Sequence, residues 1–143
     1  MGRALELATG AAGSGDVPVG AVVVSPAGEV IGEGANLREV EGDPTAHAEV
    51  VALRAAARHT GEWRLEDCTL VVTLEPCPMC AAAISFARLR RLHFAARDPK
   101  GGGVEHGPRI YAQPTCHHRP EVIAGVGEER SAELLRAFFK ARR

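Results

Sequence analysis

The stretch TLEPCPMCAA, residues 73–82, places Cys77 and Cys80 three positions apart, with a proline on each side of the first. Cysteine pairs with this spacing bind metals or exchange electrons as a dithiol, and some simply fill a core. The spacing alone does not decide between these functions, so the answer depends on what the rest of the chain brings to the pair.

The residues around the pair predict a strand that leads into a helix. Residues 69–74, TLVVTL, are short, apolar and β-branched, which is typical of a buried strand. Pro76 biases Glu75 away from the helical conformation, and Pro78 suits the first turn of a helix over 78–89. Both sulfur atoms then lie at a helix N-terminus, where the helix dipole favours thiolates, the form that binds metal. A redox pair fits the same geometry, so a third ligand is needed to distinguish the two.

The rest of the chain predicts one α/β domain over residues 1–143, with a sheet that carries helices on its faces. The expected strands are 19–24, 30–35, 69–74, 90–96 and 121–126, and the expected helices are 3–12, 45–58, 78–89 and 129–142. Residues 104–120 receive no assignment.

Composition narrows the class of protein. Four cysteines in 143 residues do not suit a disulfide-stabilised scaffold. The first residues lack the apolar core of a signal peptide, and no apolar run reaches membrane-spanning length. We therefore expect a soluble cytoplasmic protein with no membrane partner.

A third metal ligand is found in DPTAHAEVVALRAAAR, residues 43–58. Asp43 suits a helix N-cap and Pro44 the first helical position. In the apolar helix expected to follow, His47 and Glu49 stand out. Residues two positions apart on a helix are rotated by about 200° around its axis, so the side chains of His47 and Glu49 cannot share a face. They converge only if the site lies beyond the helix N-terminus, toward which helical side chains lean.

Two thiolates and one imidazole leave a four-coordinate Zn²⁺ with one open position, which is the arrangement of a catalytic zinc. Such an ion makes a water molecule far more acidic. A carboxylate beside that water can take its proton, an effect worth roughly 10²- to 10⁴-fold in rate. The pattern predicts His47, Cys77 and Cys80 as ligands and Glu49 as the proton carrier.

The signature H-x-E followed by P-C-x-x-C is known from zinc-dependent nucleobase deaminases. Six segments also follow, in order and spacing, the pattern of the bacterial tRNA-specific adenosine deaminases, which the chain resembles over nearly its whole length. These segments are VPVGAVVV, IGEGAN, DPTAHAEVVALR, TLEPCPMC, AARDPK and LLRAFFKARR. The segment 101–121 departs from the commoner family pattern, which has a GAAGS-like run and ends in NHRVE.

The resemblance implies a cytidine-deaminase-like fold, with three layers (α/β/α) and a mixed five-stranded sheet. It also implies a homodimer, one Zn²⁺ per subunit and a tRNA anticodon stem-loop as partner. It assigns the zinc ligands to His47, Cys77 and Cys80, and the proton shuttle to Glu49. Substrate-binding roles are implied for the Asn36 amide, the Ala48 backbone N–H, and Asp98, which would contact the flanking nucleotides.

Charge is unevenly distributed along the chain. Residues 1–67 hold 5 Lys and Arg against 11 Asp and Glu, a net −6, whereas residues 68–143 hold 12 against 7, a net +5. A basic half can present a phosphate-binding face, although solvated helix faces would give the same count. Arg97 and Lys100, which flank Asp98, are the predicted RNA contacts.

Three functions are consistent with these features. The first is hydrolytic deamination of the wobble adenosine to inosine in a tRNA anticodon loop, with an arginine tRNA as the expected substrate. The second is deamination of a free nucleobase or nucleoside of the guanine, cytosine or cytidine type. The third is a non-enzymatic binding module in which zinc only connects two helices. Glu49 argues against it, because a structural zinc site needs a fourth protein ligand and no acid or base.

Overall fold

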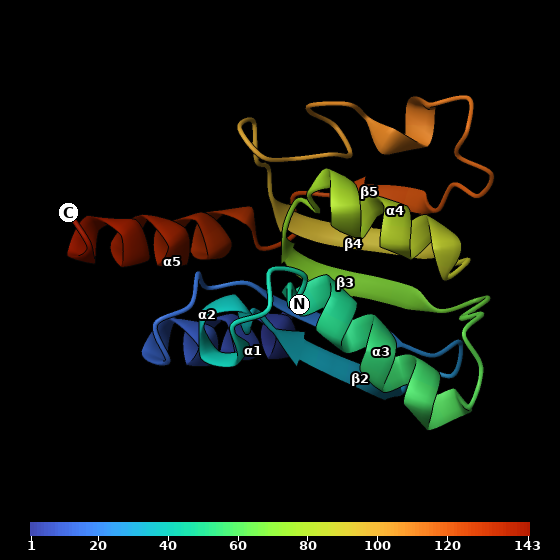
Figure 1. Cartoon of the computed structure of the whole chain (residues 1–143), viewed down its shortest axis with the longest axis horizontal. Helices are drawn as coiled ribbons and strands as arrows, with labels where there is room; N and C mark the ends of the chain where they lie inside the picture. The colour runs from blue at the N-terminus through green and yellow to red at the C-terminus, as the bar shows by residue number, and fades with distance from the viewer.

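The computed structural model describes all 143 residues and contains one mixed sheet of five strands in the order β2-β1-β3-β4-β5 (Figure 1). β1 pairs antiparallel with β2 and β3, whereas β3, β4 and β5 run parallel. The strands are β1 (Gly20–Val24), β2 (Val30–Ala35), β3 (Thr69–Leu74), β4 (Arg91–Ala96) and β5 (Glu121–Ala124). All five expected strands are present, and the predicted mixed sheet is confirmed.

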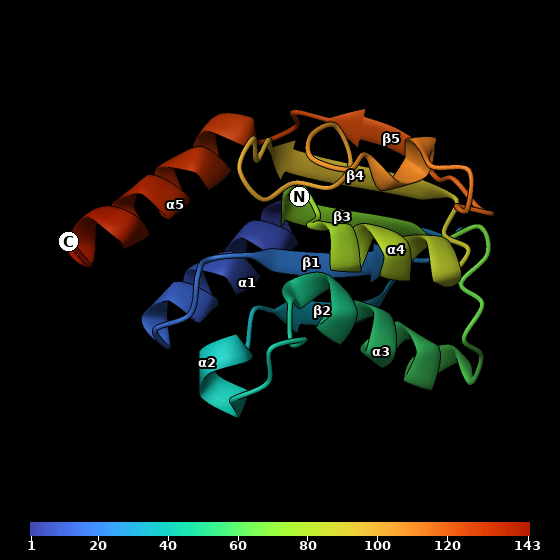
Figure 2. The same ribbon diagram turned by 45° about the horizontal axis from the view of Figure 1, so that its top comes forward.

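Helices cover both faces of this sheet, as a three-layer α/β/α fold requires. α3 and α4 lie on one face, and α1 and α5 lie on the other, with the end of α5 extending beyond the sheet (Figures 1 and 2). The helices are α1 (Gly2–Gly13), α2 (Arg38–Glu41), α3 (Ala48–Thr60), α4 (Pro78–Phe86) and α5 (Glu128–Ala141). None of them is long and apolar enough to cross a membrane.

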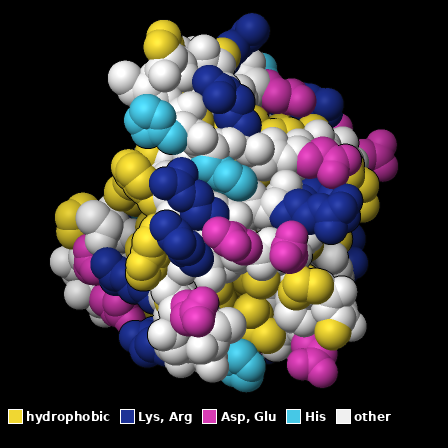
Figure 3. All heavy atoms as spheres, turned by 90° about the vertical axis from the view of Figure 1, so that its right-hand side faces the viewer, with side chains coloured by type: hydrophobic (Ala, Val, Ile, Leu, Met, Phe, Trp, Pro, Cys, Tyr) yellow, Lys and Arg dark blue, Asp and Glu magenta, His cyan; other side chains and the backbone are white.

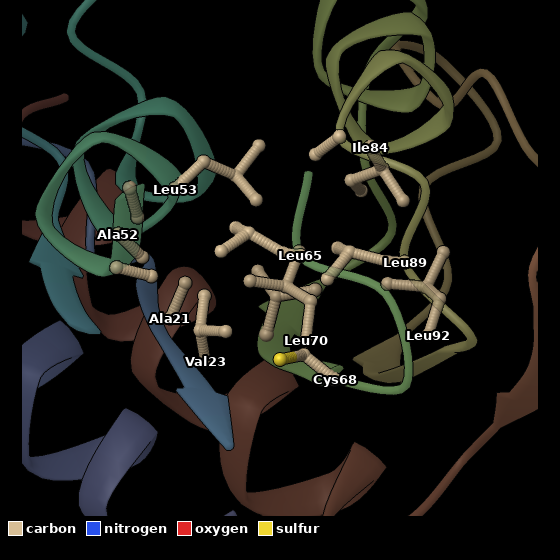
Figure 4. Close-up of a cluster of buried hydrophobic side chains, with 14 of the residues drawn as sticks. Ala21, Val23, Ala52, Leu53, Leu65, Cys68, Leu70, Ile84, Leu89 and Leu92 are labelled. Atoms are coloured by element: carbon tan, nitrogen blue, oxygen red, sulfur yellow. The ribbon is translucent and has the colours of Figure 1, made fainter. Parts of the chain in front are cut away.

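The main core lies between the sheet and the α3–α4 layer (Figure 4). Val23 and Leu70 of the sheet pack there with Leu53 of α3 and Ile84 of α4. Cys68 is 5% exposed in the same cluster, where it packs as a small buried hydrophobe. This packing fixes the two helices whose N-termini carry the predicted ligands.

Glycines in β2 let α3 lie directly on the sheet. A Cβ at Gly34 would lie 2.2 Å from the carbonyl oxygen of Ala48, and one at Gly32 would lie 2.5 Å from that of Ala52. Only glycine fits at such a close approach of helix to strand. The first turn of α3 is therefore held against β2 by backbone contact.

Two predicted helix boundaries were wrong. α3 begins at Ala48 rather than at residue 45, because Asp43 does not cap it: the Asp43 carboxylate accepts hydrogen bonds from the N–H and hydroxyl of Thr45 within a turn. α4 ends at Phe86 rather than at residue 89, since Arg88 has a left-handed backbone, with φ of 62°. The unassigned interval 104–120 contains one short 3-10 helix, Ile110–Ala112.

Candidate active site

Two helix N-termini bring the three predicted ligands together. His47 is the N-cap of α3, with an extended backbone (φ −70°, ψ 151°), and Cys77 is the N-cap of α4. Cys80 lies in the first turn of α4 and is fully buried. Because His47 precedes the helix, the rotation of about 200° between helical positions does not apply, and its side chain turns toward the cysteines.

The separations of the ligand atoms fit a zinc ion. Nδ1 of His47 lies 3.6 Å from Sγ of Cys77 and 3.5 Å from Sγ of Cys80, and the three atoms all lie within 4.8 Å of one another. In a tetrahedral site, bonds of about 2.3 Å to sulfur and 2.05 Å to nitrogen place those two atoms about 3.6 Å apart. These residues are therefore positioned to hold zinc, and they would do so through two thiolates and one imidazole, a ligand set that leaves a fourth position open.

The acidities of the two thiols favour metal binding. A hydrogen bond from Cys80, together with His47 nearby, lowers the pKa of the Cys77 thiol to about 4. The same sulfur–sulfur hydrogen bond raises the pKa of Cys80, so that one proton remains on the pair. Metal binding displaces such a proton, because only thiolates bind zinc.

Glu49 lies in the first turn of α3, where its side chain is buried beside the three ligands. Burial raises the pKa of Glu49 to about 7, compared with an ordinary 4.5. A carboxyl group with a pKa near neutrality can both accept and donate a proton at physiological pH. In the protein without bound metal, this acidity is compatible with the role predicted for Glu49.

A cavity of about 200 Å³ adjoins the ligands and brings most predicted site residues together. It is lined by Val17, Val19, Asn36, Arg38, His47, Ala48, Glu49, Leu74, Glu75, Cys77, Asp98 and Gly101. The Asn36 amide is held at the wall, since its Oδ1 accepts the N–H of Arg38 at 3.2 Å and its Nδ2 lies 3.4 Å from the carbonyl oxygen of Val17. The volume is below that of pockets for drug-sized ligands, and it suits a single ring system.

Known proteins share this arrangement. The family model of the cytidine and deoxycytidylate deaminase zinc-binding region matches residues 1–96. The tRNA-specific adenosine deaminase of Agrobacterium fabrum is 52% identical over 143 residues, which are 100% of this chain and 93% of that protein. The chain belongs to the tRNA-specific adenosine deaminase family.

Solved structures agree with the family assignment. A structure from studies of A-to-I editing at the wobble position of transfer RNA matches this deaminase with a TM-score of 0.90 and 52% identity, covering 92% of this chain and 95% of the other. The X-ray structure of guanine deaminase from Bacillus subtilis has a TM-score of 0.67 and 33% identity, covering 97% of this chain and 90% of the other. The zinc-binding deaminase fold and cofactor are thereby confirmed.

Six residues that line the cavity of this deaminase were not among the predicted site residues, and Glu75 is the one of them that carries a buried charge. Glu75 follows β3 directly, and its side chain is fully buried. Burial alone would raise the pKa of Glu75, but hydrogen bonds from His106 and from backbone N–H groups outweigh burial and hold it below the ordinary value. The signal available in the sequence was a charged residue between a buried strand and a proline.

The two predicted RNA contacts have different surroundings. Arg97 is held in ion pairs with Glu105 at 2.9 Å and with Glu128 at 3.1 Å. Lys100 takes part in no ion pair. Both line a groove next to the cavity, so the structure places them on the same side as Asp98.

Cys116, His117 and His118 do not form a second metal site. Cys116 is 9% exposed, and its sulfur lies 3.5 Å from the hydroxyl of Ser85. The ring of His118 instead bonds to the carbonyl oxygen of Leu89. Cys116 and His118 therefore bond to different partners, and His117 is exposed.

Proposed function

We propose that this chain is a hydrolytic, zinc-dependent deaminase that converts the wobble adenosine of a tRNA anticodon loop to inosine in the cytoplasm. The observation that carries the proposal is a basic groove of about 970 Å³ that shares Val17, Leu74 and Asp98 with the walls of the cavity. A free base would need the cavity alone, whereas a nucleotide within RNA also needs a path for the strand on either side.

The groove has the composition of a surface that binds single-stranded nucleic acid. Six of its lining residues are basic: Arg97, Lys100, Arg136, Lys140, Arg142 and Arg143. Asp98 is its only acidic residue, and Phe139, which is 47% exposed, offers an aromatic ring. Basic grooves with aromatic side chains bind the backbone and stack the bases of unpaired strands. At the opposite end of the molecule, by contrast, basic and acidic side chains are interspersed (Figure 3).

The cavity supplies the groups that the reaction needs. A base flipped out of the loop enters the cavity, as enzymes that act on single bases require. The Asn36 amide and the Ala48 N–H, which has no partner at the start of a helix, orient the ring through hydrogen bonds. Zinc bound by the three ligands makes a water molecule acidic enough to act as a nucleophile near neutral pH. Glu49 takes one proton from water and gives it to the ring nitrogen while the hydroxyl adds to the neighbouring ring carbon. It then takes the second proton from that hydroxyl and gives it to the amino group, which leaves as ammonia.

A free nucleobase is the second candidate substrate. The small cavity and the 33% identity to the guanine deaminase structure from Bacillus subtilis favour it. The zinc chemistry would be the same, but the basic groove would then have no role in the reaction.

The experiment that tests the proposal offers both kinds of substrate. The purified protein is incubated with an anticodon stem-loop that carries a wobble adenosine, and separately with adenosine, guanine, cytosine and cytidine. We expect inosine and ammonia from the stem-loop alone. Stem-loops from an arginine tRNA and from other tRNAs, each with adenosine at the wobble position, test whether the arginine tRNA is preferred. Deamination of a free base with the stem-loop untouched would select the second candidate.

We further propose that the active form is a homodimer, with a second copy of the chain on an apolar surface of α3 and α4. This surface is lined by Val50, Leu53, Arg54, Ala57, Trp63, Leu65, Ala83, Phe86 and Ala87. Trp63 and Phe86 are 59% and 71% exposed, which is unusual for large apolar side chains outside an interface. Light scattering should give a dimer mass for the parent protein and a monomer mass for Phe86→Glu. A parent that stays monomeric at high concentration would contradict this proposal.

A further inference from the structure

The buried carboxylate of Glu75 accepts five hydrogen bonds, at 2.8 to 3.3 Å. The donors are the backbone N–H groups of Asp98, Val104, Glu105 and His106 and the Nδ1 atom of His106. Because a carboxylate can only accept, the proton of this imidazole must lie on Nδ1. All five donors belong to one segment, residues 98–106, which we call the 98–106 loop.

The 98–106 loop lies directly against the start of the metal-binding helix. A Cβ at Gly102 would lie 2.3 Å from an oxygen of Glu75, and one at Gly103 would lie 2.6 Å from the backbone nitrogen of Pro78. The N–H of Gly103 donates to the carbonyl oxygen of Pro76 at 2.8 Å. The loop therefore follows the contour of Glu75 and of the first turn of α4.

The same loop forms part of the wall between the cavity and the groove. Asp98 and Gly101 line the cavity, and Lys100 lines the groove. The Asp98 carboxylate is held in place by the N–H groups of Lys100 at 3.2 Å and Gly101 at 2.9 Å. Any change in the loop backbone would move these side chains together.

We propose that Glu75 is a positioning residue for the substrate: its carboxylate holds the 98–106 loop in the shape that lets Asp98 and Lys100 meet the RNA. This inference rests on the proposed function for its substrate. Since none of the five donors lies in a strand or helix, loss of the carboxylate should disturb the loop rather than the sheet or the metal ligands. Misplaced binding groups weaken productive binding, so Glu75 sets the KM of the reaction more than its kcat.

The variant Glu75→Gln tests this proposal with little change in the shape of the side chain. One acceptor oxygen becomes an NH2 group, which cannot accept hydrogen bonds from the N–H donors that face it. We expect the KM for the stem-loop to rise on the order of tenfold, with kcat changed by less than about threefold. Zinc content should stay at one ion per chain. The matched control is Glu66→Gln, which removes the same charge from an exposed position before β3 and should leave KM unchanged.

Chemical rescue separates positioning from general support of the fold. Glu75→Ala leaves the backbone donors facing a space that a formate ion can occupy. Added formate should bring the raised KM of Glu75→Ala back toward that of the parent, whereas chloride at the same ionic strength should not. A role confined to the stability of the fold would instead lower the melting temperature and the zinc content without a response to formate.

A second measurement does not depend on the substrate. In ¹H–¹⁵N spectra, the amide protons of Val104, Glu105 and His106 should move upfield in Glu75→Gln, because they lose a carboxylate acceptor. If the parent leaves the stem-loop untouched, the proposed function fails, yet these amide signals still show whether Glu75 holds the loop. Unchanged amide signals, an unchanged KM, or a loss of kcat and zinc with KM constant would each overturn the inference about Glu75.

Discussion

Nδ1 of His47 lies 3.5 Å from Sγ of Cys80, although 33 positions separate the two residues and each belongs to a different helix N-terminus. A zinc ion held by both would therefore connect the N-terminus of α3 to that of α4. Metal binding in such a site also stabilises the folded state, since the unfolded chain does not hold the ligands together.

Removing the metal or one ligand should accordingly destabilise the protein. We expect chelation, or the variant Cys80→Ala, to lower the melting temperature by roughly 10 °C, which corresponds to about 3 kcal/mol for a chain of this size. Calorimetry and elemental analysis measure the two effects. The control Cys68→Ala removes a buried thiol outside the site and should retain zinc. Full zinc content in Cys80→Ala would show that Cys80 is not a ligand.

Glu49→Gln should keep zinc and the fold but lose turnover. The amide has nearly the same shape as the carboxyl group but cannot carry a proton, so we expect kcat to fall by at least about 100-fold. Single-turnover assays of inosine formation, combined with zinc analysis, check this result. Loss of zinc in this variant would mean that Glu49 is a ligand instead, and normal turnover would remove it from the chemistry.

The raised pKa of Glu49 also predicts how the stability of the metal-free protein depends on pH. Between pH 4.5 and about 7, the folded state keeps a proton on Glu49 that the unfolded state releases. The free energy of unfolding therefore falls as pH rises through this window, by roughly 3 kcal/mol from this group. The difference between the parent and Glu49→Gln in urea unfolding isolates the contribution. A difference that stays constant from pH 4.5 to 7 would contradict the raised pKa.

The ligands could be predicted from the sequence because local signals fix them. β3 runs over the predicted residues 69–74, and Pro78 begins α4, so both sulfur atoms lie at its N-terminus as expected. The convergence of His47 with Glu49 was predicted on the assumption that both residues lie within the helix, which is wrong for His47. His47 precedes the helix because the turn at Asp43 and the backbone bond from Leu37 to Ala46 delay its start.

The wall formed by residues 98–106 could not be predicted, because its determinants are distant in sequence. Glu75 accepts hydrogen bonds from residues 23 to 31 positions further along the chain. The sequence of such a loop shows no periodic pattern of hydrophobic residues. Its hydrogen bonds come from backbone N–H groups, which residues of nearly any type can supply. The close approach at Gly103 likewise depends on where α4 begins, which is a property of the folded chain.

The contact between β2 and α3 predicts a large cost for Gly34→Ala. Its Cβ would meet the carbonyl oxygen of Ala48 at 2.2 Å and force the first turn of α3 away from the sheet. We expect a loss of about 1–3 kcal/mol in the free energy of unfolding, together with weaker zinc binding, because His47 moves with the helix. Gly10→Ala is the control: nothing lies within 4 Å of the added carbon, and in the interior of α1 it should stabilise the protein by about 0.5–1 kcal/mol. A neutral Gly34→Ala would show that α3 can shift at little cost.

The difference between Arg97 and Lys100 leads to a prediction about RNA binding. Lys100 has no acidic partner, so its charge is available to a phosphate, whereas Glu105 and Glu128 already neutralise Arg97. In the Glu49→Gln background, which prevents turnover, we expect Lys100→Glu to weaken stem-loop binding about tenfold. The slope of log Kd against log salt should fall by roughly 0.7 to 0.9 for each phosphate that the variant no longer neutralises.

Arg97→Gln should weaken binding less, and its effect on stability should be small, because its ion pairs are exposed. Fluorescence anisotropy of a labelled stem-loop at several salt concentrations measures both variants, and zinc content should match the parent in each. Equal losses of affinity would mean that RNA draws Arg97 out of its ion pairs. An unchanged Kd and salt slope in Lys100→Glu would place the strand elsewhere on the molecule, away from the basic groove beside Asp98.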